Sequence, residues 1–285
     1  MNSESQKSLI IAVCGAPNAG KSTLINHLVG AKVTIVSPRP QTTRTTIRGI
    51  VQFDDTQLVF VDTPGIFMPK GKRQEQMVRA AVTGVDEAEE ILLLIDAKKG
   101  LDTKTENILT FLRENNKTAL CAINKIDLID KGELLPLAQK LSDSGVFREI
   151  FMISASKGKN LEDLKNCLIE NAKSSPWIYP DDQLSDANDR FMAEEITREK
   201  LFYMLDKELP FGIDVETEVF QEESDKITIH QNILTPRENH KKIIIGKNAE
   251  MVKNIGIKAR REMEKVFGCD VRLYLHVKVN KNHED

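Results

Sequence analysis

Gly15-Ala16-Pro17-Asn18-Ala19-Gly20-Lys21-Ser22-Thr23 decides the fold of this chain, because the stretch reads G-x-x-x-x-G-K-S. The apolar run Leu9–Val13 precedes it, and a segment with helical spacing, 22–29, follows it. A strand, a glycine-rich loop and a helix in this order predict a P-loop, whose backbone N–H groups and helix N-terminus bind phosphate. We expect the whole stretch to line a nucleotide site, with Lys21 reaching the β- and γ-phosphates and Ser22 ligating Mg²⁺.

Length and composition exclude several classes of protein. A chain of 285 residues predicts about two domains. The formal net charge of −3 argues against a general polyanion-binding protein. Four scattered cysteines without a C-x-x-C pair argue against a disulfide framework or a zinc site. No apolar run is long enough for a spanning helix, so we expect a cytoplasmic protein, for which peripheral contact with the inner membrane stays open.

Apolar strands alternate with helical stretches from residue 9 to about 172. This pattern predicts a doubly wound, mostly parallel α/β domain, which binds ligands at the carboxyl ends of its strands. Helices are expected near 22–30, 73–88, 103–115, 133–144 and 160–172. The predicted strands are Leu9–Cys14, Ile47–Phe53, Gln57–Asp62, Ile91–Asp96, Ala119–Asn124 and Ile150–Ser154.

A different pattern follows a proline- and serine-rich break. We predict a first domain over 1–173, a linker over 174–189 whose Trp177 and Tyr179 could pack on either domain, and a second domain over 190–285. The second domain is expected to be α+β. Its predicted elements are a helix Arg190–Leu209, antiparallel strands Ile213–Gln221 and Lys226–Leu234, a helix ending near Phe267, and a strand Asp270–Val279.

The P-loop alone permits ATP or GTP, and Asn124-Lys125-Ile126-Asp127 distinguishes them. A carboxylate at Asp127 can accept hydrogen bonds from the ring N–H and the exocyclic amine of guanine, whereas adenine would present a lone pair to it. We expect Asn124 and Lys125 to brace the loops around the base. Ser154-Ala155-Ser156 follows a strand and could offer backbone N–H groups to the guanine oxygen.

Two further segments are expected at the phosphates. Asp62-Thr63-Pro64-Gly65 ends a strand, so Asp62 would hold Mg²⁺ and the Gly65 N–H would contact the γ-phosphate. Thr43, within Gln41–Thr45, can complete the Mg²⁺ shell. We therefore expect Lys21, Thr43 and Gly65 to act in catalysis.

These motifs together resemble the Era GTPases of the TrmE–Era class. The resemblance covers nearly the whole chain and rests on GAPNAGKST, QTTR, DTPG, NKID, SAS, RFMAEEITREK and KKIIIGKNAEMVKNIG. It implies a GTPase domain joined to a type II KH domain that binds the 3′ end of small-subunit ribosomal RNA during assembly of the small ribosomal subunit. Members of this family commonly carry a helical tail after the last strand, and we expect any contact made by that tail to be missing here.

The resemblance also bears on hydrolysis. Ile66 follows Gly65, where Ras-like GTPases carry the glutamine that orients water, so we expect slow hydrolysis without a partner. In TrmE-type relatives an asparagine at the position of Asn18 helps to hold K⁺. Asn18 is therefore a candidate K⁺ ligand, with a purely structural role in the loop as the alternative.

Gly246-Lys247-Asn248-Ala249 occupies the place of the G-x-x-G loop, which clamps about four nucleotides in KH domains. Ala249 replaces the second glycine. If Ala249 opens a helix, its φ should be ordinary and the replacement should cost little. Residues 237–261 carry a net charge of +6, and residues 206–225 carry −7. The expected RNA contacts are Lys241, Lys242, Gly246, Lys247, Asn248, Ala249, Lys253, Lys258 and Arg261.

The leading interpretation is a GTP-switched RNA-binding assembly factor, in which GTP orders Gln41–Thr45 and Gly65–Arg79. The alternative is a membrane-linked or cell-cycle GTPase with a weak or vestigial KH domain. An ATP-dependent kinase is disfavoured by Asp127.

Overall fold

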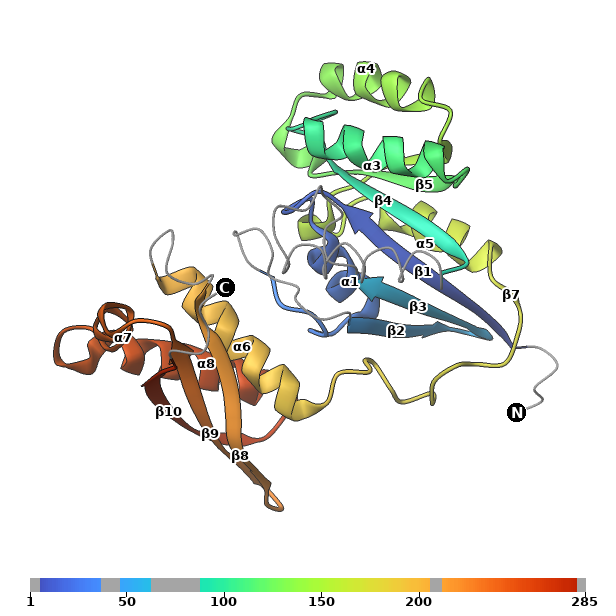
Figure 1. Ribbon diagram of the computed structural model, residues 1–285. Helices are drawn as coiled ribbons and strands as arrows, with labels where there is room; N and C mark the ends of the chain where they lie inside the picture. Colours follow the sequence, from blue (N-terminus) through green and yellow to red (C-terminus); the bar gives the residue numbers. More distant parts are fainter. Residues whose placement is uncertain (1–5, 37–46, 63–87, 206–211, 281–285) are drawn as a thin grey trace. The chain divides into compact units, whose positions relative to one another are not determined.

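The computed structural model describes residues 6–36, 47–62, 88–205 and 212–280 (Figure 1). The chain divides into two compact units, residues 1–34 with 40–186 and residues 35–39 with 187–285. The expected helix over 73–88 falls outside the described residues except for Ala88, which is not helical. Most of the predicted linker, residues 174–186, belongs to the first unit.

The first unit is built on one mostly parallel sheet, as predicted. Within the described residues its strand order is β2-β3-β1-β4-β5-β6, with β2 antiparallel to β3 and with β7 antiparallel to the start of β1. The strands are β1 Lys7–Gly15, β2 Ile47–Phe53, β3 Thr56–Asp62, β4 Glu90–Asp96, β5 Ala119–Asn124, β6 Phe147–Met152 and β7 Lys173–Ser174. The helices are α1 Lys21–Val29, α3 Thr103–Glu114, α4 Lys131–Ser142 and α5 Leu161–Glu170, with short 3₁₀ turns η2 Ile126–Leu128 and η3 Ala155–Lys157.

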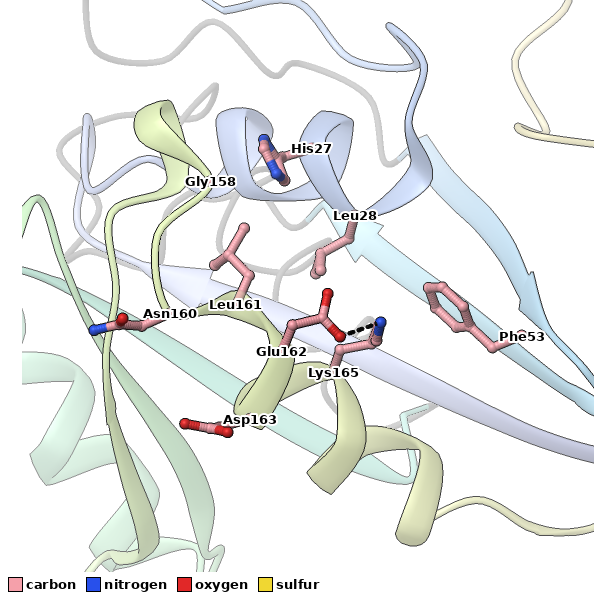
Figure 2. Close-up of a pocket in the computed structure, with 9 residues that line it drawn as sticks. All are labelled: His27, Leu28, Phe53, Gly158, Asn160, Leu161, Glu162, Asp163 and Lys165. Carbon is pink, nitrogen blue, oxygen red and sulfur yellow. Dashed lines mark ion pairs between the residues drawn. The ribbon is translucent and has the colours of Figure 1, made fainter.

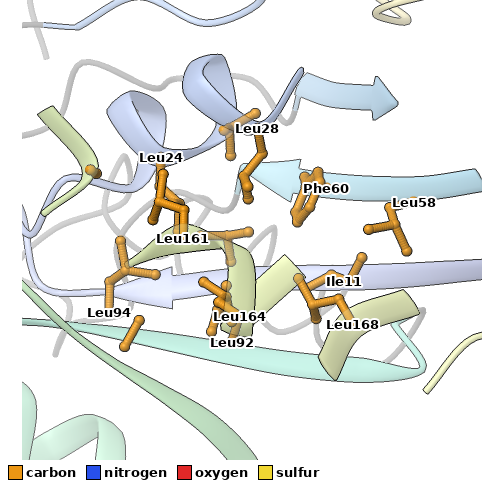
Figure 3. Packing of buried hydrophobic residues seen from close by; sticks show 14 of the residues in the cluster. Ile11, Leu24, Leu28, Leu58, Phe60, Leu92, Leu94, Leu161, Leu164 and Leu168 are labelled. Atoms are coloured by element: carbon orange, nitrogen blue, oxygen red, sulfur yellow. The ribbon is translucent and has the colours of Figure 1, made fainter. Parts of the chain in front are cut away.

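Helices cover both faces of this sheet, which explains its continuous apolar strands. Leu92 and Leu94 of β4 join the cluster under α1 and α5, with Phe60 of β3 and Leu164 of α5 (Figure 3). Alternate residues of the same strand, such as Leu93, join the cluster under α3 and α4. Every residue of β3 and β4 is buried.

One strand is shifted from its expected position. β6 covers Phe147–Met152 and not Ile150–Ser154. The ladder ends earlier because Ser154 turns to pair with Lys159, while the backbone of Phe147 pairs with Ala119 across a bulge. The exposed polar pair Arg148-Glu149 interrupts the apolar pattern, so the sequence predicted a later beginning for this edge strand.

The proline-containing segment 175–186 is an ordered strap along the edge of the sheet in the first unit. Trp177 donates its ring N–H to the Asp55 carbonyl at 3.1 Å, and the Ile50 N–H donates to the Leu184 carbonyl at 2.9 Å. The fully buried Gln57 holds the strap centrally. Its side chain accepts hydrogen bonds from the backbone N–H groups of residues 178 and 179 and donates one to the carbonyl of residue 179, all within 3.0 Å. The strap thus covers β2, which would otherwise expose an unpaired edge.

The second unit is an α+β domain with a three-stranded sheet in the order β10-β9-β8 among its described residues. β8 and β9 are antiparallel, as predicted, and β10 is parallel to β9. The elements are α6 Asp189–Met204, β8 Asp214–Glu222, β9 Lys226–Thr235, α7 Glu238–Ile245, η5 Lys247–Ala249, α8 Glu250–Phe267 and β10 Asp270–Val279. Ile196 of α6, Ile229 of β9 and Met263 of α8 lie in its core.

Helix α7 is absent from the sequence prediction. Ile243-Ile244-Ile245 has strand-like composition, yet these residues end a helix in which only Ile244 is buried. Helix α6 ends at Met204, before the expected end at Leu209, and residues 206–209 lie outside the described part of the chain.

We expect Gln57→Leu to lower the free energy of unfolding of the first unit by about 2–4 kcal/mol, because it leaves the strap's backbone groups without partners. Urea unfolding followed by the fluorescence of Trp177, the single tryptophan, measures this locally. Gln52→Leu is the matched control, since Gln52 donates one hydrogen bond to the Pro180 carbonyl. Equal effects of the two substitutions would contradict a central role for Gln57.

Candidate nucleotide and RNA sites

The stretch 15–23 joins β1 to α1 with backbone angles that ordinary residues avoid. Gly15 has φ 149°, Asn18 has φ 65° and Gly20 has φ 102°. A Cβ on Gly15 would approach the Leu94 carbonyl oxygen to 2.5 Å, and one on Gly20 would collide with the Asn124 side chain. Glycine is therefore required at both ends of the loop, which leaves a cradle that side chains would fill. Ala16, Pro17 and Ala19 complete the loop, and Thr23 lies in the first turn of α1.

Lys21 begins α1 and folds back over the loop, where its ammonium donates to the Gly15 carbonyl at 3.1 Å. Burial lowers the pKa of Lys21, while the charge of Asp62 and the neighbouring Cys14 oppose this shift. A bound phosphate would favour the charged ammonium. The environment of Lys21 therefore suits the predicted contact with the β- and γ-phosphates.

Ser22 and Asp62 are brought together from α1 and the end of β3. The Ser22 hydroxyl donates to Asp62 Oδ2 at 2.9 Å, and the carboxylate is fully buried. A hydroxyl and a carboxylate are oxygen donors of the kind that Mg²⁺ prefers, so this pair fits the ion. The other residues expected here, Thr43, Thr63, Pro64 and Gly65, lie outside the described residues, as does Ile66.

Asn124 connects three loops at the end of β5. Its side-chain amide donates to the Ala19 carbonyl of the P-loop at 2.8 Å. Its side-chain oxygen accepts from the backbone N–H groups of Lys125 at 2.8 Å and Ala155 at 2.9 Å. Asn124 is buried, so these hydrogen bonds fix the loops with little competition from water.

Lys125 makes a second connection to the P-loop. It adopts φ 67°, and its ammonium donates to the Asn18 carbonyl at 2.5 Å and to Asp96 Oδ2 at 2.7 Å. Asp96 was not among the residues predicted from sequence. The signal that could have revealed it is a carboxylate at the carboxyl end of a buried strand beside β5, where Asp96 is paired in register with Asn124.

Asp127 is exposed and lies in η2, next to the segment Ser154–Ser156. The Ser154 hydroxyl donates to Asp127 Oδ1 at 2.6 Å. This hydrogen bond is the main reason that the pKa of Asp127 is lowered. Asp127 is therefore an ionised acceptor near neutral pH, which suits the N–H groups of guanine. Ala155 is buried and Ser156 is exposed in η3.

A pocket of about 420 Å³ elsewhere on the first unit contains none of the predicted nucleotide residues (Figure 2). The lining residues are His27 and Leu28 of α1, Phe53 of β2, and Gly158, Asn160–Asp163 and Lys165 around the start of α5. Lys165 pairs with Glu162, and its ammonium lies 5.2 Å from the centre of the Phe53 ring. The contact with Phe53 joins α5 to β2, whereas the pair with Glu162 lies within α5.

The loop after α7 departs from the expected backbone. Gly246 has φ 73°, and a Cβ there would approach Met251 Cβ to 2.7 Å. Asn248 and Ala249 also have positive φ, 51° and 58°. The condition for an ordinary φ at Ala249 is not met, because Ala249 caps α8 in the left-handed conformation and α8 begins at Glu250. The added methyl therefore costs about 1 kcal/mol relative to glycine.

The predicted basic residues gather on this loop and its flanking helices. Lys241 is half-buried and Lys242 is exposed on α7, and Lys247 is exposed in the loop. Lys253, Lys258 and Arg261 are exposed on α8. These exposed ammonium and guanidinium groups can attract a polyanion without loss of packing.

The fold and the sites define a P-loop GTPase domain followed by a KH domain. The family described as 50S ribosome-binding GTPase matches residues 10–125, and the KH domain family matches residues 208–284. The chain is 45% identical to GTPase Era of Bradyrhizobium diazoefficiens, over 96% of this chain and 90% of that protein. It is 43% identical to GTPase Era of Rickettsia conorii, over 98% of this chain and 83% of that protein.

Solved structures agree with these relatives. A crystal structure of Era with MgGDPNP and nucleotides 1506–1542 of 16S ribosomal RNA is 37% identical, with a TM-score of 0.91, over 96% of this chain and 94% of that chain. A crystal structure of a substituted form of Aquifex aeolicus Era bound to GDP·AlF4⁻ gives the same values. The chain therefore belongs to the Era family of GTPases. None of the helices in the described part of the chain has the length and apolar character needed to cross a membrane.

We expect Ser154→Ala to raise the pKa of Asp127, because the hydrogen bond that favours the carboxylate is lost. If GDP binding requires ionised Asp127, acidification should abolish binding at a higher pH in the variant than in the wild type. Carbon-detected NMR of the Asp127 carboxyl and a pH series of GDP affinity measure the two effects. Ser142→Ala, at an exposed position of α4, is the control. An unchanged titration midpoint in Ser154→Ala would refute this origin of the shift.

Ala249→Gly should raise the free energy of unfolding by about 0.5–1 kcal/mol, because glycine adopts the left-handed conformation without strain. Ala259→Gly is the matched control and should destabilise, since Ala259 is buried within α8. Thermal unfolding followed by circular dichroism compares the variants. Destabilisation by both substitutions would show that the conformation at Ala249 is not strained.

Proposed function

We propose that this protein is a slow GTPase that binds the 3′ region of small-subunit ribosomal RNA through its KH domain and acts in assembly of the small ribosomal subunit. One observation carries the proposal. Over 96% of its length the chain is similar to an Era structure that contains MgGDPNP and a 16S ribosomal RNA fragment, with a TM-score of 0.91. The nucleotide and RNA residues predicted from sequence lie in the matching units.

The first unit would bind the guanine nucleotide and Mg²⁺. Asp127, held by Ser154, would accept the N–H groups of guanine, and residues 15–23 would enclose the phosphates. Ser22 and Asp62 would hold Mg²⁺, together with Thr43 from outside the described residues. When bound, Mg²⁺ neutralises charge that develops on the β- and γ-phosphate oxygens. Lys21 and the Gly65 N–H would contact the same phosphates.

The rate of hydrolysis depends on how the attacking water is oriented. Ile66 cannot orient water by hydrogen bonding, so the intrinsic rate should be slow and a partner or cation should raise it. Asn18 is the candidate K⁺ ligand. Its carbonyl accepts a hydrogen bond from Lys125 at 2.5 Å, which fixes this turn of the P-loop and supports the assignment.

The second unit would bind the RNA. The loop 246–249 would clamp the RNA backbone, with Lys247 exposed at its tip and basic residues on α7 and α8 around it. The KH family match over residues 208–284 supports this assignment over a vestigial domain. A cytoplasmic location and peripheral contact with the inner membrane stay predictions.

The test measures GTP hydrolysis by the full chain with and without the 1506–1542 fragment, in K⁺ and in Na⁺. We expect a slow basal rate, a several-fold increase with RNA, and faster hydrolysis in K⁺ than in Na⁺. Lys247→Ala should weaken the RNA effect and leave the basal rate unchanged, because Lys247 is exposed in the KH loop. Equal RNA responses of wild type and Lys247→Ala would reject the loop as the RNA site, and equal rates in the two salts would reject the K⁺ assignment.

A further inference from the structure

The sheet of the second unit has one face that its helices leave open. Residues 227, 229 and 271 lie in the core cluster with residues of α6 and α8. Because side chains alternate along a strand, the residues between them point to the opposite face. On β10 these are Asp270, Arg272, Tyr274, His276 and Lys278, all exposed.

An aromatic stack lies at the centre of this open face. Tyr274 is paired in register with His230 of β9, and their ring centres lie 4.7 Å apart at an interplanar angle of 36°. His230 in turn is opposite Val219 of β8. Tyr274 is 49% exposed and Val219 is 36% exposed, so the row forms a small platform with one accessible ring.

Charge is distributed unevenly across the same face. Arg272 is the next residue of this face before Tyr274, with Asp270 beyond it, and Lys278 follows His276 on the other side. Glu216 and Glu218 are exposed on β8. Lys278 lies 3.7 Å from Glu218, which marks the border between the basic and acidic sides. Because Lys278 is paired with Glu218, an RNA phosphate would lie beside Arg272 on β10 and away from the glutamates of β8.

We propose that this open face, along β9 and β10, is a second contact surface for single-stranded RNA, with one base stacked on Tyr274. Stacking on an exposed ring of a sheet is a common way of binding unpaired bases, and flanking cations hold the phosphates. A protein partner is less suited, because the exposed large apolar side chains of β8–β10 are Val219 and Tyr274 alone among the described residues. The inference rests on the proposed function, since it assumes an RNA partner.

The test measures binding of the fluorescent 1506–1542 fragment to the full chain at several KCl concentrations. Tyr274→Ala should weaken binding about 5- to 100-fold, the range for loss of one stacked base. The slope of log affinity against log salt should not change, because no charge is removed. Tyr274→Phe should bind as the wild type does, since the ring is kept. Lys247→Ala should instead reduce the slope by about 0.7.

Two controls separate RNA contact from a structural role. Tyr203→Ala removes another exposed tyrosine, 54% exposed on α6, and should leave RNA affinity unchanged. Ultraviolet cross-linking of the wild type should attach a nucleotide to the peptide that contains Tyr274. A cross-strand pair that only stabilises the sheet would lower the melting temperature without giving this adduct.

The outcomes distinguish the inference from the proposed function. If Lys247→Ala weakens binding and Tyr274→Ala does not, the open face is not an RNA surface, while the KH loop keeps its role. If Tyr274→Ala weakens binding to the small ribosomal subunit but not to free RNA, the face contacts a ribosomal protein and the inference is overturned. If the wild type does not bind the fragment, the proposed function fails with it.

Discussion

The buried carboxamide of Asn124 is the interaction on which the nucleotide site depends. It joins the P-loop at Ala19, the base-recognition loop at Lys125 and the loop at Ala155, which are far apart in the sequence. Each of these loops carries groups expected at a different part of the nucleotide. Because the amide uses its donor and its acceptor at the same time, an aspartate or an aliphatic side chain of similar size could not hold all three. The lysine beside it strengthens the arrangement by pairing with Asp96 at the end of the neighbouring strand.

A second constraint acts at the edge of the same sheet. β2 is the antiparallel edge strand, and the segment after β7 covers it through backbone and glutamine hydrogen bonds. A sequence with prolines is suited to this position, since proline has no backbone N–H that needs a partner and reduces the conformational entropy of the unfolded chain. The connection between the two units therefore begins at Ala187, after an ordered strap, and not at the first proline.

In the KH loop, tertiary packing overrides the backbone preference of one residue. Alanine disfavours positive φ, yet Ala249 adopts 58° because α7 must end and α8 must begin within a few residues. Gly246 takes the conformation that leads out of α7, with Met251 packed closely against it. The packed cores of the two helices outweigh a local strain of about 1 kcal/mol.

The sequence by itself determined the α/β class, the order of most elements, the P-loop, the guanine-recognition motif and the two-domain organisation. It could do so because these features depend on short-range periodicity and on motifs whose chemistry lies within a few residues. Tertiary structure alone decided the partnership of Asp96 with Lys125, the course of the strap on Gln57, helix α7, the conformation of Ala249 and the pairing of Tyr274 with His230. The strap and the two cross-strand pairs depend on which strands become neighbours and in what register, and residues separated by tens of positions do not specify that register locally. Helix α7 and the conformation of Ala249 depend on how α7 and α8 pack on the sheet, where Ile244 and Ile255 share one core cluster.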